Sequence, residues 1–209
     1  MAVDAGDFLP ARRDLEALRR AAQECRGCDL WEPATQTVFG EGPEDARMVL
    51  VGEVPGDRED REGHPFVGPA GRELARALEA VGVPRDDVYI TNAVKHFKFE
   101  ERGKRRIHQR PSASQIKACR PWLRAELDAI QPEALVALGA TAAKTLLGST
   151  FRLMAQRGEP VDSDLAPIVI ATIHPSAILR GSDGQARQAQ RDLFTEDLRV
   201  AAQALAARD

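Results

Sequence analysis

The sequence predicts an α/β protein: a three-layer α/β/α sandwich in which a parallel sheet of four strands has helices on both faces. Four apolar runs have the unbroken hydrophobicity typical of buried parallel strands, at 48–51, 88–91, 134–138 and 168–173. Patterns with helical spacing separate these runs, and such an alternation produces a parallel sheet. A length of 209 residues with 43% hydrophobic content suits one domain with a real core.

The helices are predicted from apolar side chains that recur three or four positions apart. The first lies within 11–24, where Leu15, Leu18 and Ala22 share a face. Later helices are expected at 71–81, 114–130, 140–147 and 186–207, with Ser112 or Ser114 as the cap of the second of these. We expect one domain over 1–209, with the N-terminal helix and a cysteine-containing segment at 11–30.

Composition excludes some classes of protein. No apolar run approaches the roughly 20 residues that span a bilayer, and the N-terminal residues lack the apolar core of a signal peptide, so a cytoplasmic location is expected. The net charge of −3 does not indicate nucleic acid. Residues 98–110, however, carry six basic against two acidic residues, a local charge that attracts phosphate. A solvated flexible loop is the alternative.

Three cysteines, an odd number, do not suggest a disulfide framework. Cys25 and Cys28 form a C-x-x-C motif that closes a helix, whereas a redox motif opens one after a strand. The motif therefore favours metal or cluster ligation, with a pair of free thiols as the alternative.

Polar residues follow three of the predicted strands. Glu53 follows the first, Asn92 the second and His174 the fourth. Ligands bind outside the carboxyl ends of parallel strands, so these residues predict a site at that rim. The segment 51–71, rich in glycine and proline and carrying carboxylates and Phe66, suits a ligand loop there. An ordinary strand-to-helix loop is the alternative.

These motifs together resemble a known family. The stretch GEVPGDREDREGHPFVGPAG from Gly52, TNAVK at 91–95 and HPSAILR at 174–180, with the upstream C-x-x-C and Cys119, resemble the iron–sulfur uracil-DNA glycosylases of family 4. The resemblance runs from about residue 20 to the C-terminal helix. It implies DNA repair by base excision, a hydrolytic activity, and a uracil pocket at the rim.

The resemblance also implies roles for residues of the pocket. Phe66 is expected to stack on the extruded base, and Asn92 to read the O4 and N3–H edge of uracil, which cytosine reverses. Backbone amides of Val54, Gly56 and Asp57 are expected to support the base. His174 is expected to stabilise the charge that builds on uracil O2.

Two departures from family 4 resemble its UdgX branch, whose members become covalently joined to DNA. His96 stands where the family has a fourth cysteine, and the basic loop 103–112 contains His108. We expect His108 to capture C1′ of the sugar and Glu53 to orient or polarise it. The reaction would then be single-turnover, and a conventional enzyme or a non-catalytic single-strand-binding module are the alternatives.

The basic loop is also expected to hold DNA. Lys104, Arg105 and Arg106 would lower the pKa of His108 and grip phosphates, and Gln109 and Ser176 are further candidates for backbone contacts. The expected partner is uracil-containing DNA, preferably single-stranded, bound by a monomer.

A [4Fe–4S] cluster is expected on Cys25, Cys28, His96 and Cys119, with a structural role. Zinc on the same Cys₃His set is the chemical alternative, and a labile cluster with His96 pointing to DNA is another.

Overall fold

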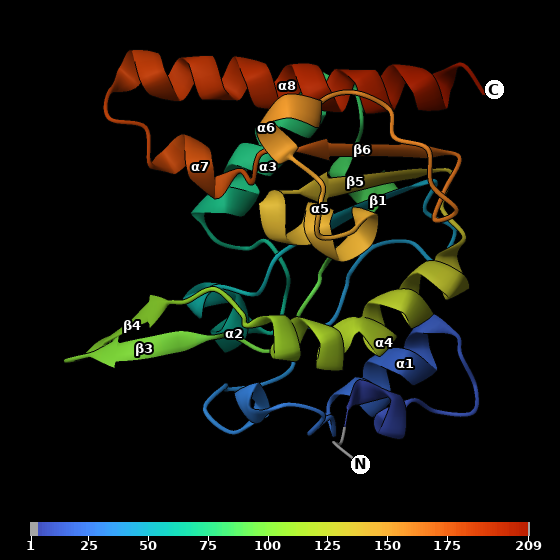
Figure 1. Ribbon diagram of the computed structural model, residues 1–209, viewed down its shortest axis with the longest axis vertical. Coiled ribbons are helices and arrows are strands. Elements are labelled where there is room, and N and C mark those ends of the chain that lie inside the picture. Colours follow the sequence, from blue (N-terminus) through green and yellow to red (C-terminus); the bar gives the residue numbers. More distant parts are fainter. Residues whose placement is uncertain (1–3, 209) are drawn as a thin grey trace.

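The computed structural model describes residues 4–208 and has a four-stranded parallel sheet at its centre (Figure 1). Its strands are β1 (Met48–Gly52), β2 (Val88–Asn92), β5 (Ala134–Leu138) and β6 (Ile168–Thr172), in the spatial order β2-β1-β5-β6. Every pair of neighbours is parallel. The predicted fold class is confirmed, and all four strands begin where the apolar runs begin.

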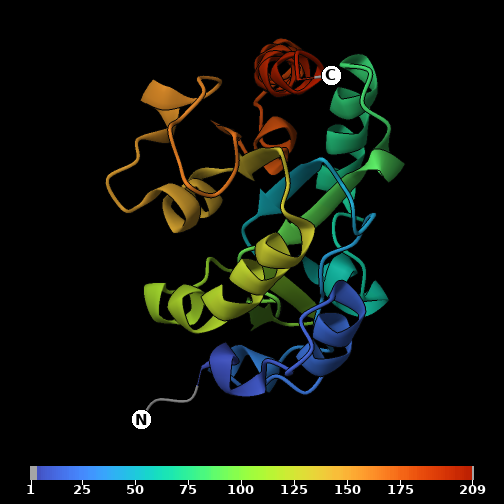
Figure 2. The same ribbon diagram turned by 90° about the vertical axis from the view of Figure 1, so that its right-hand side faces the viewer.

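Both faces of the sheet are covered because every strand residue is buried and successive side chains point to opposite faces. Val49 and Val51 join a cluster with α1 (Leu15–Ala22), α4 (Ala113–Ile130) and α5 (Ala140–Leu147). Met48 and Leu50 join a second cluster with α3 (Pro69–Ala80), α7 (Ser176–Leu179) and α8 (Gly184–Ala206). Figure 2 shows the long α8 end-on beside the sheet, opposite α1 and α4.

The helix ends follow from local capping. Ser112 caps α4 in a capping box with Gln115, and Asp183 accepts from the Ala186 N–H at 2.8 Å at the start of α8. Shorter elements that the pattern did not predict are α2 (Asp57–Glu62), α6 (Leu153–Gln156) and the 3₁₀ turns Ala5–Phe8, Asp29–Trp31 and Arg85–Asp87. Within residues 4–208, no helix has the length and apolarity that crossing a membrane requires.

The basic segment differs from the loop that was expected. It forms an antiparallel hairpin of β3 (Phe99–Arg102) and β4 (Arg105–His108), in which Phe99 pairs with His108. Gly103, with φ of 60°, supplies the left-handed residue that the tight turn requires. The hairpin projects from the body of the protein beside α2 (Figure 1). His108 is therefore the last residue of a strand and not part of a flexible loop.

Candidate functional site

The predicted rim site begins where β1 and β2 end side by side. Gly52 pairs in register with Asn92, and Glu53 follows directly. The strands that follow β1 in sequence lie on opposite sides of it, β2 on one side and β5 on the other, so the switch point of the sheet, where ligands bind, lies between the ends of β1 and β5. Thr141, on α5 after β5, donates its hydroxyl to Glu53 Oε1 at 2.8 Å. Thr141 was not predicted, although its place two residues after Gly139 at the end of β5 gave a signal.

The pocket wall is an unpaired amide oxygen beside an aromatic ring. Asn92 is 2% exposed, and its Oδ1 is buried without a hydrogen-bond partner. A methyl group on Gly52 would collide with both this oxygen and the Phe66 ring, so glycine permits the two to approach. Phe66 itself adopts φ of 58°, and its carbonyl packs against Gly71, where any side chain would overlap it. The backbone therefore holds the Phe66 ring beside Asn92 Oδ1, a hydrogen-bond acceptor without a donor.

The segment between β1 and α2 borders this pocket. Val54 is buried, Gly56 is the N-cap residue of α2, and Asp57 is its first residue. The N–H groups in the first turn of a helix have no acceptor within the helix. These backbone amides are consistent with the predicted support of the base.

His174 is held as a neutral hydrogen-bond donor. The Ser176 N–H donates to His174 Nδ1 at 3.2 Å, so Nδ1 carries a lone pair and the ring proton is on Nε2. Burial, together with the smaller effects of the charges on His108 and Arg180, lowers the pKa of His174 to about 4. The His174 ring lies 5.8 Å from the Phe66 ring, centroid to centroid. The two predicted residues therefore lie beside each other at the rim.

His108 lies near the same pocket, at the base of the hairpin. Its ring centroid is 6.1 Å from that of Phe97, and the residue remains open to solvent at its edge. Partial burial disfavours the charged form of His108 and lowers its pKa, whereas the nearby Glu53 carboxylate raises it. Arg180 lowers it again, and Glu59 and Arg110 have smaller opposing effects. The structure thus brings His108 within electrostatic range of Glu53 and His174.

The main causes of the His108 shift differ from the expected one. Burial lowers its pKa most, and Arg180 and Arg110 are the cations with the largest effect, whereas a contribution from Lys104, Arg105 and Arg106 stays a prediction. Lys104 and Arg105 are exposed at the tip of the hairpin, away from the imidazole at its base.

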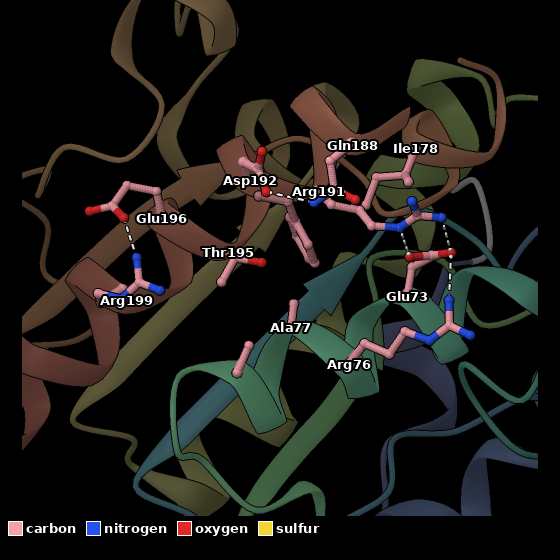
Figure 3. Close-up of a pocket in the computed structure, with 12 residues that line it drawn as sticks. Glu73, Arg76, Ala77, Ile178, Gln188, Arg191, Asp192, Thr195, Glu196 and Arg199 are labelled. Atoms are coloured by element: carbon pink, nitrogen blue, oxygen red, sulfur yellow. Dashed lines mark hydrogen bonds and ion pairs between the residues drawn. The ribbon is translucent and has the colours of Figure 1, made fainter. Parts of the chain in front are cut away.

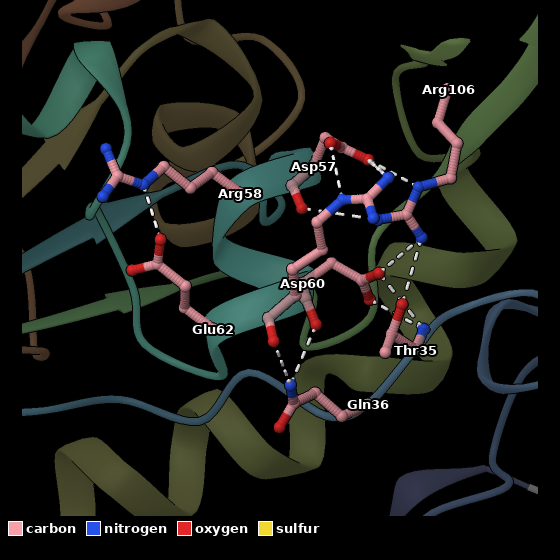
Figure 4. Close-up of polar contacts among 8 residues, drawn as sticks. Thr35, Gln36, Asp57, Arg58, Asp60, Glu62 and Arg106 are labelled. Atoms are coloured by element: carbon pink, nitrogen blue, oxygen red, sulfur yellow. Dashed lines mark hydrogen bonds and ion pairs between the residues drawn. The ribbon is translucent and has the colours of Figure 1, made fainter. Parts of the chain in front are cut away.

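Arg106 anchors the hairpin instead of facing outward, which corrects the expectation that it grips phosphate. Its guanidinium donates to Asp57 Oδ1 at 2.5 Å, to Asp60 Oδ2 at 2.7 Å and to Thr35 Oγ1 at 3.1 Å (Figure 4). Its Cζ also lies 5.3 Å from the Phe97 centroid and 4.9 Å from that of Phe99. A planar guanidinium suits such combined ion pairing and stacking. Arg106 therefore fixes β4 to α2.

The other candidates for backbone contacts differ in exposure. Lys104 and Arg105 are free of any ion pair among the contacts of the described residues. Gln109 is half-buried, and its N–H donates to Lys98 O at 2.8 Å. The Ser176 hydroxyl bonds His174 Nδ1 at 2.8 Å and accepts from Arg180 at 3.0 Å. Lys104 and Arg105 are thus exposed cations at the tip of the hairpin.

The three cysteines gather beneath β2 and α4. Burial raises the pKa of Cys119 to about 12, with smaller contributions that oppose it from Lys95 and add to it from Cys28 and Cys25. Trp122 Nε1 donates to Cys25 Sγ at 3.1 Å, and the Lys95 N–H donates to Cys119 Sγ at 3.3 Å. Donors aimed at sulfur are the contacts that tune cluster thiolates.

His96 presents an unused nitrogen. The Thr37 hydroxyl donates its proton to Ala22 O at 2.9 Å, so it accepts from His96 Nε2 at 2.8 Å. The other nitrogen, Nδ1, then carries a lone pair, and it is buried without a hydrogen-bond partner. Burial lowers the pKa of His96 to about 4 and keeps the ring neutral. A neutral imidazole with a free lone pair fits a cluster ligand, and its burial excludes contact with DNA.

The described residues do not form a ready-made site for a single metal ion. Among residues 4–208, no three His, Cys, Asp or Glu side chains converge closely enough to hold one. Thiolate sulfur and imidazole nitrogen are ligands of both zinc and iron–sulfur clusters, so the donor types fit either group.

Two cavities lie elsewhere. One of about 390 Å³ lies between α3 and α8, where Arg191 and Arg76 both bond the carboxylate of Glu73 (Figure 3). The other, of about 820 Å³, lies at the amino ends of β1 and β2 and includes Met48 and Val88. Neither includes a residue predicted for the rim site.

Comparisons with known proteins agree with this geometry. Residues 39–199 match the model of the uracil DNA glycosylase superfamily. The chain is 38% identical over 175 residues to a type-4 uracil-DNA glycosylase of Thermotoga maritima, covering 83% of this chain and 88% of the relative. It is 34% identical over 196 residues to a type-4 uracil-DNA glycosylase of Pyrobaculum aerophilum, covering 88% and 91%. A type-5 uracil-DNA glycosylase of the same organism is 32% identical, covering 78% and 76%.

Proposed function

The chain belongs to the uracil-DNA glycosylase superfamily, and from this membership we propose that it excises uracil from DNA and becomes covalently attached through His108, as in the UdgX branch. The proposal of covalent attachment is supported by the hairpin, whose last residue, His108, has a neutral imidazole near Glu53 and His174 at the rim. The enzyme would act once per molecule in the repair or sensing of uracil.

Base recognition rests on Asn92. Its unpaired Oδ1 would accept the N3 proton of uracil, and its amide nitrogen would donate to O4. Cytosine has the opposite pattern on that edge and would leave buried groups unpaired, so it is rejected. Phe66 would stack on the base after it leaves the DNA stack.

Cleavage sends the bonding pair of the C1′–N1 bond onto the base. The Nε2–H of His174 would then donate to uracil O2 as negative charge develops there. A preorganised donor of this kind is worth about 2.7–4 kcal/mol. Because the pKa of His174 is about 4, the donor is a neutral imidazole over the physiological pH range.

Attachment follows at the cationic sugar carbon. A lone pair of neutral His108 forms the C1′–N bond, and the imidazolium that results gives up its other proton, while the departed base anion takes one up. Glu53, held by Thr141, orients His108 and stabilises the positive charge. An effective molarity of roughly 10⁵ M or more lets a held imidazole outcompete water. The N-linked product has no ready leaving step, so the protein remains attached.

The remaining candidates bind the DNA chain. Lys104 and Arg105 at the hairpin tip would meet phosphates, with Gln109 and Ser176 closer to the sugar. Single-stranded DNA is the expected preferred form, because its base needs no unpairing, and the protein would act as a monomer.

A [4Fe–4S] cluster would be held by Cys25, Cys28, Cys119 and the free Nδ1 of His96. Bound there, it would cross-link the N-terminal segment to α4 and the end of β2, a structural role. Iron and sulfide analysis with a brown visible absorbance tests it; a colourless protein with one zinc would overturn it.

A denaturing gel tests the main proposal. The protein is mixed with uracil-containing single-stranded DNA, boiled in detergent and resolved, and released uracil is measured in parallel. We expect a slower protein–DNA band for the native chain and for His64→Ala, which alters an exposed histidine paired with Glu41. His108→Ala should lose the band. A band that persists in His108→Ala would identify another nucleophile.

A conventional turnover glycosylase is the second candidate, favoured by the type-4 relatives. It predicts free uracil and no slow band, whereas a binding module without chemistry predicts neither.

A further inference from the structure

Lys95 is an ammonium group buried where charges are costly. The residue is 1% exposed, at the end of the turn that follows β2. A buried charge persists only when it is paired and hydrogen-bonded. Its Nζ forms an ion pair with the fully buried Glu126 of α4. This pair plays no part in the chemistry described above.

The carboxylate of Glu126 is held by several donors. It accepts from the Tyr89 hydroxyl at 2.8 Å, the Gly40 N–H at 3.1 Å and the Thr91 hydroxyl at 2.9 Å. Removal of any one donor would leave the carboxylate in place. The position of the Lys95 ammonium is therefore set by a rigid anchor in α4.

From this anchor, Lys95 reaches the residue that faces the base. Its Nζ donates to the carbonyl oxygen of Asn92 at 2.8 Å and to Thr91 Oγ1 at 2.6 Å. The next two N–H groups of the turn, Ala93 and Val94, donate to the carbonyls of Gly52 and Glu53 at 2.9 and 3.1 Å. Three hydrogen bonds thus hold the backbone of this turn in place. The Lys95 ammonium supplies the one that is made to the carbonyl oxygen of Asn92.

The amide of Asn92 gains from such fixing, because its Oδ1 has no partner of its own. Without a bound base, no hydrogen bond to that oxygen keeps the side chain in place. Its direction then depends on the backbone to which it is attached, and a displacement of about 1 Å in such a group costs roughly 10²-fold in rate.

We propose that Lys95, held by Glu126, is a positioning residue that aligns Asn92 with the N3–H and O4 edge of uracil and so determines base specificity. This inference rests on the proposed glycosylase activity. Lys95 does not touch the base; it acts through the Asn92 peptide.

The test compares two bases in single-turnover excision. Uracil offers both groups that Asn92 reads, whereas 2-pyrimidinone has neither the N3 proton nor O4. The variant is the double change Lys95→Met with Glu126→Gln, which removes the charged pair together and keeps an acceptor for Tyr89. The control is Glu73→Gln with Arg191→Met, an ion pair between α3 and α8 in which Glu73 is buried and Arg191 is 33% exposed. Circular dichroism and iron content check that each protein is folded.

We expect the double variant to lose about 10²-fold in uracil excision and less than about twofold on 2-pyrimidinone, while the control changes neither by more than about twofold. Equal losses on both bases, or no loss, would overturn the inference. If the double variant does not fold, Thr91→Val decides by the same comparison, because it removes one acceptor of the ammonium with little change in volume. A native chain that releases no uracil refutes the proposed function itself, a result distinct from these.

Discussion

Replacing Arg106 with glutamine should separate uracil excision from covalent attachment. The guanidinium is 13% exposed and pairs with Asp60, which is fully buried, and with Asp57, which is 42% exposed. Breaking a fully buried pair costs about 3–5 kcal/mol. Because one partner is in contact with water, we expect about 2–3 kcal/mol here.

That loss falls mainly on the hairpin, since an isolated two-stranded sheet is marginally stable. A cost of about 2–3 kcal/mol lowers the equilibrium constant for the anchored hairpin about 30- to 150-fold, which is the largest factor by which its population can fall. An effective molarity of about 10⁵ M exceeds the roughly 55 M of water about 2,000-fold. In the Arg106 variant, capture of C1′ by His108 should therefore still be faster than capture by water, by about 10- to 70-fold. Unattached abasic DNA should rise from under about 0.1% to about 1–7% of the excised product.

The assay uses end-labelled uracil-containing DNA, with alkali to cleave free abasic sites and a denaturing gel to count them against the protein-bound band. Arg102→Gln is the control, because Arg102 lies on the same hairpin and, among residues 4–208, forms its ion pair with the exposed Glu100. A level of unattached product equal to that of the native chain would refute the anchoring role. So would an equal loss of uracil release and attachment.

Three further predictions concern the pocket and the cluster. The pKa of His174, about 4, lies below the ordinary value of 6.5, so the folded state binds the proton less readily than the unfolded chain does. The contribution of neutral His174 to stability therefore falls as pH drops from about 6.5 towards 4. The rate of single-turnover uracil release should stay constant between about pH 7.5 and 5.5, because His174 remains neutral over that range. A midpoint near 6.5 in the rate would contradict this. Gly52→Ala should slow uracil release by about 10²-fold and lower the melting temperature, because the methyl group would overlap Asn92 Oδ1 and the Phe66 ring and force them to move; a native rate would show that the base binds elsewhere. His96→Ala should lose the brown absorbance and the bound iron, whereas His96→Cys should keep both. Thr37→Val should lower cluster retention, because it removes the hydrogen bond that holds the His96 imidazole. A full iron content in His96→Ala would remove His96 from the ligand set.

The sheet and the rim could be predicted from sequence because each depends on local patterns. Unbroken apolar runs indicate strands buried on both faces, and polar residues after them must meet at one edge. Glu53, Asn92 and His174 were located in this way, and the structure brings their strand ends together.

The hairpin could not be predicted, because its strands are mostly charged and lack the alternation that reveals a half-buried strand. Gly103 alone indicated a turn. The role of Arg106 depends on Asp57 and Asp60, some 46 to 49 residues earlier in the chain, and such long-range partners leave no local signal. For the same reason, Glu126 became visible only once the fold placed it beside Lys95. The position of Thr141 just after β5 gave a signal, but its contact with Glu53 required the structure.

The hairpin is joined to the rest of the molecule in a way that makes it separable. Its two ends, Phe99 and His108, face each other across the ribbon, and it shares no strand pairing with the central sheet. A short connector could therefore replace the whole ribbon without disturbing the sheet. Conversely, transplanting it onto a turnover glycosylase that carries two suitably spaced acidic residues on the corresponding helix would convert a reusable enzyme into a permanent label for uracil in DNA.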